Sequence, residues 1–115
     1  MNFEYNLNKK NNIILVKLSG ELIDRSQALE LLADIEVCMA KGENKILLNL
    51  VDLRYVNSNG LDILINILTK ARKSGGDAAI CSVNKKINDL LVITKLDSIF
   101  NISADEAQAL EKLNK

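Results

Sequence analysis

The residues best placed to do chemistry lie between Asn57 and Gly60, a run of small polar residues between two apolar segments. Ile46 to Leu50, just before it, is almost continuously apolar, as in a buried strand, and after it apolar residues recur at helical spacing from Leu61. Free backbone N–H groups and the helix dipole attract negative charge to the first turn of a helix. Asn57 or Ser58 could cap these groups. The turn is therefore suited to a carboxylate or a phosphate.

Most catalytic and metal-binding groups are missing from the sequence. It has no histidine, and neither phosphate-binding pattern, G-x-x-x-x-G-K-[ST] or G-x-G-x-x-G, occurs. Cys38 and Cys81 lie in apolar segments far apart in the chain, which is typical of buried cysteines in a reducing compartment. Asp24 and Asp52 could be paired carboxylates, so an enzyme with a carboxylate base remains an alternative. We expect no enzymatic activity, no metal site and no cofactor.

The composition argues against nucleic acid and membrane as direct partners. The 15 basic and 15 acidic residues cancel, and only 3% of residues are aromatic, which leaves little to hold a phosphate backbone or to stack on bases. Residues 1–5 lack the features of a signal peptide, and no apolar run approaches the roughly 20 residues that span a bilayer. We expect a single cytoplasmic domain over residues 1–115, with no membrane insertion.

Hydrophobic spacing and turn residues predict alternating strands and helices after an opening hairpin. In chain order we expect strands at 3–7 and 13–18, a helix opened by a capping box of Asp24 and Gln27 and ended by Gly42, the strand at 46–50, the helix from Leu61, a strand at 77–82, a helix capped by Asn84, an edge strand at 99–102 and a final helix opened by a capping box at Ser103–Glu106. This order predicts an α/β protein with a mixed sheet, parallel where a helix connects two strands.

One segment resembles the signature of a known family. The run from Asn49 to Leu64, N-L-V-D-L-R-Y-V-N-S-N-G-L-D-I-L, is similar to the STAS-domain pattern in which a hydrophobic strand precedes D-L-x-[FY]-[IMV]-D-S-[STA]-G-[LV]. Leu18–Leu22 and Leu96–Phe100 resemble the second-strand ending and a late segment of the same family. The likeness extends over almost the whole chain and is strongest to small bacterial anti-sigma factor antagonists.

The resemblance implies a fold and a partner. It implies a STAS fold with a sheet of four to five strands and about four helices packed mainly on one side. Such antagonists bind an anti-sigma factor that is also a serine kinase, of the histidine-kinase-like ATPase type, and so release a sigma factor. Phosphorylation of the motif serine ends the binding, and a phosphatase restores it. Aligned on Gly60, that serine is Ser58.

The neighbours of Ser58 depart from the family pattern. The family aspartate is Asn57, and the small residue before the glycine is the bulkier Asn59. Three possibilities stay open: Ser58 is phosphorylated as in the family, the chain is a constitutive antagonist, or the turn is structural with Ser58 as a helix cap. Asp24, displaced by Ile23 from its usual place in the family, is either a contact residue or only a helix cap.

The helix after Gly60 carries two isoleucines outside its predicted buried stripe of Leu61, Leu64, Ile65 and Leu68. At about 100° per residue Ile63 points away from this stripe and Ile67 lies beyond its flank. Neighbouring elements could cover both, or both could form an apolar patch that docks a protein.

The predicted partner-binding set comprises Asp24, Asn57, Ser58, Asn59, Gly60, Ile63 and Ile67. The alternative function, which the same resemblance also implies, is a non-phosphorylated STAS subunit docked on a membrane transporter such as a lipid-transport ABC complex.

Overall fold

The alternating residues at the start of the chain fold as the predicted hairpin, which opens a single sheet. The computed structural model describes residues 3–10 and 12–113. The strands are β1 (Phe3–Lys10), β2 (Ile13–Leu22), β3 (Lys45–Val56), β4 (Asp77–Cys81) and β5 (Asn101–Ser103). They lie in the spatial order β1-β2-β3-β4-β5, with β1 antiparallel to β2 and all other neighbours parallel. The predicted mixed α/β sheet and its late edge strand are therefore confirmed.

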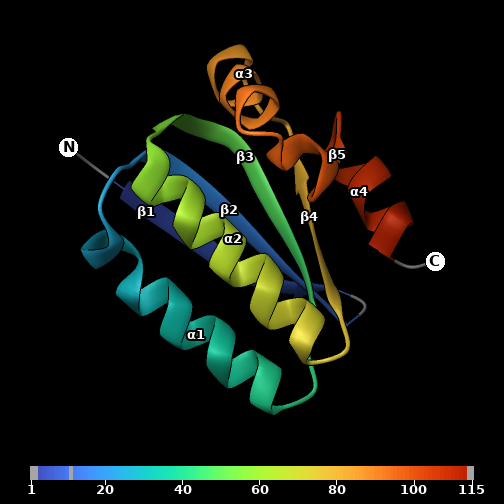
Figure 1. Cartoon of the computed structure of the whole chain (residues 1–115). Coiled ribbons are helices and arrows are strands. Elements are labelled where there is room, and N and C mark those ends of the chain that lie inside the picture. Colours follow the sequence, from blue (N-terminus) through green and yellow to red (C-terminus); the bar gives the residue numbers. More distant parts are fainter. Residues whose placement is uncertain (1–2, 11, 114–115) are drawn as a thin grey trace.

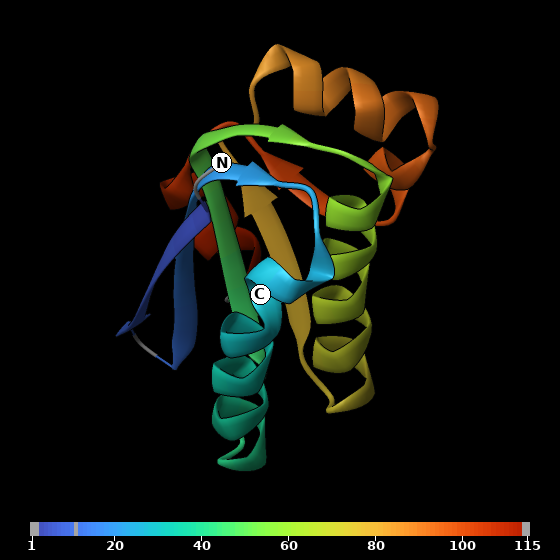
Figure 2. The same ribbon diagram turned by 90° about the vertical axis from the view of Figure 1, so that its left-hand side faces the viewer.

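The helices alternate with the strands in the predicted order. They are α1 (Leu29–Ala40), α2 (Ser58–Lys73), α3 (Lys85–Ile93) and α4 (Glu106–Leu113), with 3₁₀ segments at Arg25–Ala28 and Leu96–Ser98. Helices α1 and α2 run side by side across one face of the sheet, and α3 lies beyond the amino end of α2 (Figures 1 and 2). Helix α4 packs against the opposite face at β4. Helices α1, α2 and α3 thus share one core on the same face of the sheet, which agrees with the prediction that the helices pack mainly on one side.

Two apolar layers hold the helices to the sheet. The larger layer joins alternate residues of β2 and β3, such as Val16 and Leu48, to the inner faces of α1, α2 and α3. The smaller layer lies under α4 and consists of Ile13, Leu47, Ala79, Cys81, Ala109 and Leu113. Burial raises the pKa of the Cys81 thiol and keeps it protonated. Strands covered on both faces become continuous apolar runs, which is why β3 begins as Ile46 to Leu50.

Strand β3 continues further than the sequence predicted, and α2 begins earlier. The strand pairs with β2 as far as Leu22 and Val56, and the register shifts between Lys17 and Ser19 and again between Gly20 and Glu21. Such irregularities interrupt the alternation by which a strand is recognised in a sequence. The predicted turn therefore shrinks to Asn57, and the helix starts at Ser58 instead of Leu61.

The predicted helix starts are confirmed at two places and wrong at a third. Asp24 and Gln27 form the expected capping box, although a 3₁₀ turn precedes α1, and Asn84 caps α3. For α4 the predicted cap at Ser103 is wrong, because that residue belongs to β5 and Asp105 accepts the hydrogen bond from the Gln108 N–H at 2.9 Å. Among the described residues no helix has the length and apolar character needed to cross a bilayer. Residues 1–2, part of the signal-peptide prediction, lie outside this range.

Candidate functional site

The amino end of α2 is held by an asparagine cap. Asn57 adopts an extended backbone, and its side-chain oxygen accepts a hydrogen bond from the Gly60 N–H at 3.0 Å. Its amide nitrogen donates to the carbonyl of Ile23 at 3.1 Å. An aspartate could accept the first bond but could not donate the second while ionised. Asn57 therefore keeps the cap without a charge and also ties α2 to the segment that follows β2.

The segment after β2 is ordered by a second set of hydrogen bonds. Asn59 also donates to the Ile23 carbonyl, at 3.4 Å. On the other side of that residue, the Gln27 side chain accepts from the backbone N–H groups of Ile23 and Asp24, each at 2.9 Å. Asp24 accepts from the Ser26 N–H at 3.2 Å and is exposed. Asp24 is therefore a helix cap that lies beside the α2 amino end, which the sequence could place only as one of two possibilities.

Ser58 is the first residue of α2 and is exposed. Because Asn57 is the cap, the alternative in which Ser58 caps the helix is wrong. Within the described ranges the Ser58 hydroxyl has no hydrogen-bond partner, and the free N–H groups and dipole of a 16-residue helix lie directly behind it. A phosphate on this hydroxyl would be accessible to solvent and electrostatically favoured by the helix.

Gly60 lies against the end of β2. A Cβ atom at this position would approach the Leu22 carbonyl oxygen more closely than 3.0 Å, which real Cβ atoms essentially never do, and would lie 3.1 Å from the Cβ of Val56. The glycine of the sequence signature is therefore required by close packing of the helix on the strand end, since its φ does not lie in the left-handed region.

Of the two possibilities for Ile63 and Ile67, burial under neighbouring elements is confirmed, and the exposed docking patch is wrong, as is their place in the predicted partner-binding set. Ile63 is 1% exposed and Ile67 is 0% exposed, and both belong to the larger core. Helix α2 packs on β3 and β4 of the sheet and also contacts α1 and the 3₁₀ segment before it, so its buried face is wider than a single stripe. Ile65, predicted as buried, is only half-buried. These two isoleucines stabilise the fold and do not face a partner.

The exposed apolar surface beside Ser58 is instead a groove between the β3–α2 junction and α3. Its volume is about 580 Å³, and its lining residues are Tyr55, Val56, Asn57, Ser58, Lys86, Ile87, Asp89 and Leu90. Tyr55 is 45% exposed. At about 100° per residue Ile93 continues the α3 face formed by Lys86, Asp89 and Leu90, and it is 77% exposed. The groove surface, defined as these lining residues and Ile93, brings Ser58 next to an open apolar wall.

Sequence reasoning missed the α3 side of this surface. Helical spacing after the Asn84 cap predicts that Ile87, Leu90, Leu91 and Thr94 point inward, but in the structure Leu90 is half-buried and Thr94 is exposed. An available signal was that Val92 and Ile93 fall outside the predicted inward set on a short helix. Whether Val92 or Ile93 lies on the Ser58 side depends on how α3 packs on the sheet, and the sequence does not specify this packing.

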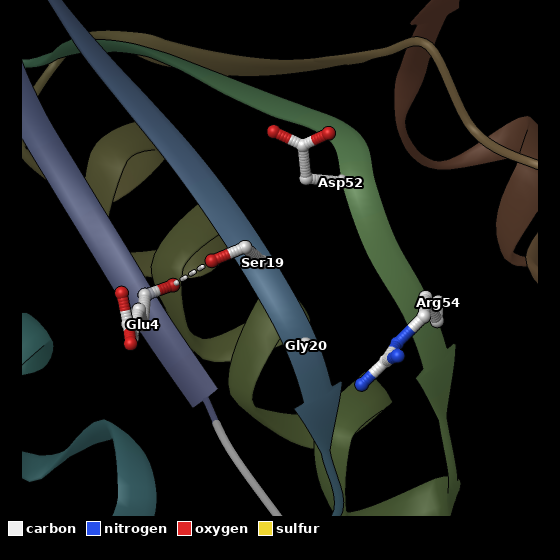
Figure 3. A pocket seen from close by; sticks show the side chains of 5 residues that line it. All are labelled: Glu4, Ser19, Gly20, Asp52 and Arg54. Atoms are coloured by element: carbon white, nitrogen blue, oxygen red, sulfur yellow. Dashed lines mark hydrogen bonds between the residues drawn. The ribbon is translucent and has the colours of Figure 1, made fainter.

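A separate hollow lies on the sheet face opposite α1 and α2. It measures about 300 Å³ and is lined by Glu4, Ser19, Gly20, Asp52 and Arg54. Figure 3 shows the two carboxylates on β1 and β3, with β2 between them and with the Ser19 hydroxyl donating to the Glu4 carbonyl at 3.4 Å. Strand spacing places the carboxylate-bearing strands about 10 Å apart. The Asp52 carboxylate pairs with Lys17 at 3.3 Å, and Asp24, the other half of the imagined acid pair, does not line this hollow.

Comparison with known proteins gives concordant results. A family model described as the STAS domain matches residues 4–109. The anti-sigma F factor antagonist of Paenibacillus polymyxa is 27% identical over 113 residues, covering 98% of this chain and 97% of that protein. A Thermotoga maritima protein named as a candidate anti-sigma factor antagonist is 37% identical over 75 residues, covering 65% of this chain and 66% of that protein. The crystal structure of a candidate anti-sigma factor antagonist from Thermotoga maritima has a TM-score of 0.87 at 28% identity, covering 96% of this chain and 95% of the other.

Proposed function

This chain belongs to the STAS domain family, and from that premise we propose that it is an anti-sigma factor antagonist: it binds an anti-sigma factor in the cytoplasm and so releases a sigma factor. Relatives that align over most of the chain carry that name. The observation that carries the proposal is an exposed serine at a helix amino end beside an apolar groove. A protein partner can pack against such a surface, and the described residues contain no group of three or more metal-ligating side chains.

The proposed partner is an anti-sigma factor of the histidine-kinase-like ATPase type that transfers a phosphoryl group to Ser58. Phosphorylation would place about −1.5 to −2 charges on a hydroxyl that borders Tyr55, Val56 and Leu90. A partner that buries this apolar wall would then have to desolvate the phosphate, so binding would weaken. Removal of the phosphate by a phosphatase would restore the apolar surface. The neutral Asn57 cap adds no like charge beside the phosphate, which favours phosphorylation at this altered turn.

The partner is identified by capture. The tagged chain is incubated with lysate of its own organism, and retained proteins are identified by mass spectrometry. Recovery of a histidine-kinase-like ATPase supports the proposal. Recovery of a transporter permease without such an ATPase contradicts it and favours the alternative of a STAS subunit on a lipid-transport ABC complex, for which Asn57 and Asn59 would mark the absence of a phosphorylation cycle.

Two adjacent α3 residues provide a matched pair for testing the groove. Ile93→Asp places a charge on the wall that continues past Leu90, whereas Val92→Asp places the same charge about 100° away around the helix. Both side chains are exposed, at 77% and 51%, so both variants should fold with unchanged melting temperature. We expect capture of the ATPase to fall at least tenfold for Ile93→Asp and to stay unchanged for Val92→Asp. Equal binding by both variants would contradict the proposed surface.

The modification is tested with the captured ATPase, ATP and intact-mass measurement. The wild-type chain should gain the mass of one phosphate, and Ser58→Ala should gain none while still binding the ATPase. Ser26→Ala, at another exposed serine near the site, is the matched control and should be modified like the wild type. Binding without any mass gain would contradict phosphorylation and leave a constitutive antagonist.

A further inference from the structure

The outward face of α1 carries a row of exposed apolar residues along its length. Helix α1 lies at the margin of the molecule, with α2 on one side (Figure 1). Its inner face carries Leu31, Leu32, Ile35 and Cys38, which are buried. Its outer face carries Leu29, Ala33, Val37 and Ala40, all exposed, with Leu29 and Val37 at 57% and 56%. These four residues, the α1 outer stripe, form one continuous apolar row at spacings of four, four and three residues.

This pattern differs from the other long helix of the chain. Helix α2 exposes Asp62, Thr69 and Lys73 on its outward side, as an amphipathic surface helix normally does. On α1 the charged residues are displaced to the flanks of the stripe. Glu36 on one flank pairs with Lys70 of α2, and Asp34 on the other accepts a hydrogen bond from the Tyr5 hydroxyl at 2.6 Å. Ala33, Val37 and Ala40 therefore form an apolar row between these flanks, and Leu29 lies at the edge of the row, about 20° around the helix from Glu36.

We propose that the α1 outer stripe is the contact surface for a second copy of this chain, with the two α1 helices antiparallel. In an antiparallel pair related by a two-fold axis, positions whose numbers have the same sum lie opposite each other. The residue numbers of Leu29 and Ala40 and those of Ala33 and Val37 give sums that differ by only one. A single two-fold axis therefore brings both pairs opposite each other to within one residue, about 1.5 Å along the helix. The same axis thus sets a large side chain against an alanine at both places. Large against small is the arrangement that lets two helices approach closely.

The charges on one flank fit the same axis. Glu30 and Lys41 are eleven residues apart, so they lie within about 20° of each other around α1. The sum of their residue numbers differs by one from the sum for Ala33 and Val37, so the same two-fold axis also brings these two positions opposite each other. An antiparallel two-fold brings each flank of one helix against the same flank of the other. Glu30 of each copy would therefore meet Lys41 of the second copy, twice per pair. Neither side chain has an ion-pair partner inside the described part of this chain.

The contact leaves the groove surface open in both copies. Ser58 lies at the amino end of α2, away from the outward side of α1, so a pair of chains would present two such sites. One helix face on each side buries less than a standard protein interface, and we expect a weak association with a dissociation constant on the order of 100 µM.

Charge exchange on the full-length chain tests the arrangement by sedimentation equilibrium. Glu30→Lys and Lys41→Glu should each raise the dissociation constant about tenfold, because two attractions become two repulsions. An equimolar mixture of the two variants should associate again as tightly as the wild type, since every facing pair is then opposite in charge. The single variants exclude a parallel pair: there position 30 would face position 30, like charges would face each other before and after each exchange, and neither variant would raise the dissociation constant.

A second set of variants separates the stripe from other surfaces. Val37→Glu should abolish association while the melting temperature of the monomer stays within about 2 °C, as expected for an exposed position. Ile93→Asp on the groove surface should leave association unchanged. A wild-type chain that stays monomeric up to 1 mM, or association that fails to recover in the mixture, would overturn the proposal and assign the stripe to another occupant.

Discussion

Replacing Gly60 with alanine tests how closely α2 packs on the end of β2. One methyl group is added in the first turn of a helix, where alanine is intrinsically favoured over glycine by about 1 kcal/mol. In the folded chain the new Cβ would lie within 3.0 Å of the Leu22 carbonyl oxygen and 3.1 Å from the Val56 Cβ. Neither neighbour is the end of a flexible side chain, so the helix must shift away from the strand.

The steric cost should exceed the gain in helix propensity. Forcing an extra methyl group against rigid neighbours costs roughly 3 to 4 kcal/mol when backbone must move, which leaves a net loss of about 2 to 3 kcal/mol. A chain of this length unfolds with an entropy near 0.24 kcal/mol per degree, so this loss lowers the melting temperature by about 10 °C.

Thermal unfolding followed by circular dichroism measures this effect. Asn59→Ala is the matched control: it lies in the same turn, is exposed, and makes one long hydrogen bond at 3.4 Å. It should cost no more than about 0.5 kcal/mol. A Gly60→Ala chain that melts at or above the wild-type temperature would refute the close approach and show that the signature glycine serves another purpose.

Three further variants are expected to behave as follows. Asn57→Ala removes the cap on Gly60 and the bond to the segment after β2, so unfolding experiments should show a loss of about 1 to 2 kcal/mol. Ile63→Asp buries a charge at a site that is 1% exposed and should prevent folding, whereas Ile63→Val should cost about 1 kcal/mol; a folded Ile63→Asp chain by circular dichroism would contradict burial. Burial, and next the hydrogen bond from its hydroxyl to Asp34, raise the pKa of Tyr5 from its ordinary value of 10.0. The stabilisation that the protonated Tyr5 hydroxyl provides is therefore complete below pH 10 and is lost as the pH rises further. The melting temperatures of the wild type and Tyr5→Phe should accordingly converge above pH 10.

The order of the elements could be predicted because it depends on local patterns. The β-branched run at Ile13, the capping box at Asp24 and the cap at Asn84 each rest on residues close in sequence. Element ends were less predictable. Strand β3 reaches Val56 because it pairs with β2 through two register shifts, and pairing partners are distant in the chain.

The candidate site was only partly predictable for the same reason. The polar run from Asn57 to Gly60 is visible in the sequence, and the helix dipole behind it follows from the change of period. That Asn57 and Asn59 both donate to the Ile23 carbonyl could not be foreseen, because those residues are more than 30 positions apart. The same limit left the burial of Ile63 open, because the residues that cover it in the larger core come from other elements of the chain.

By itself the sequence determined an α/β chain with a serine at the amino end of a helix, because residue spacing fixes which local structures can bury their apolar side. Only the tertiary structure decided which apolar residues stay outside. Helix α3 docks beside Ser58 and leaves Ile93 in water, while both isoleucines of α2 are buried in the larger core. Burial depends on what packs against a residue, and the elements that pack here come from distant parts of the chain.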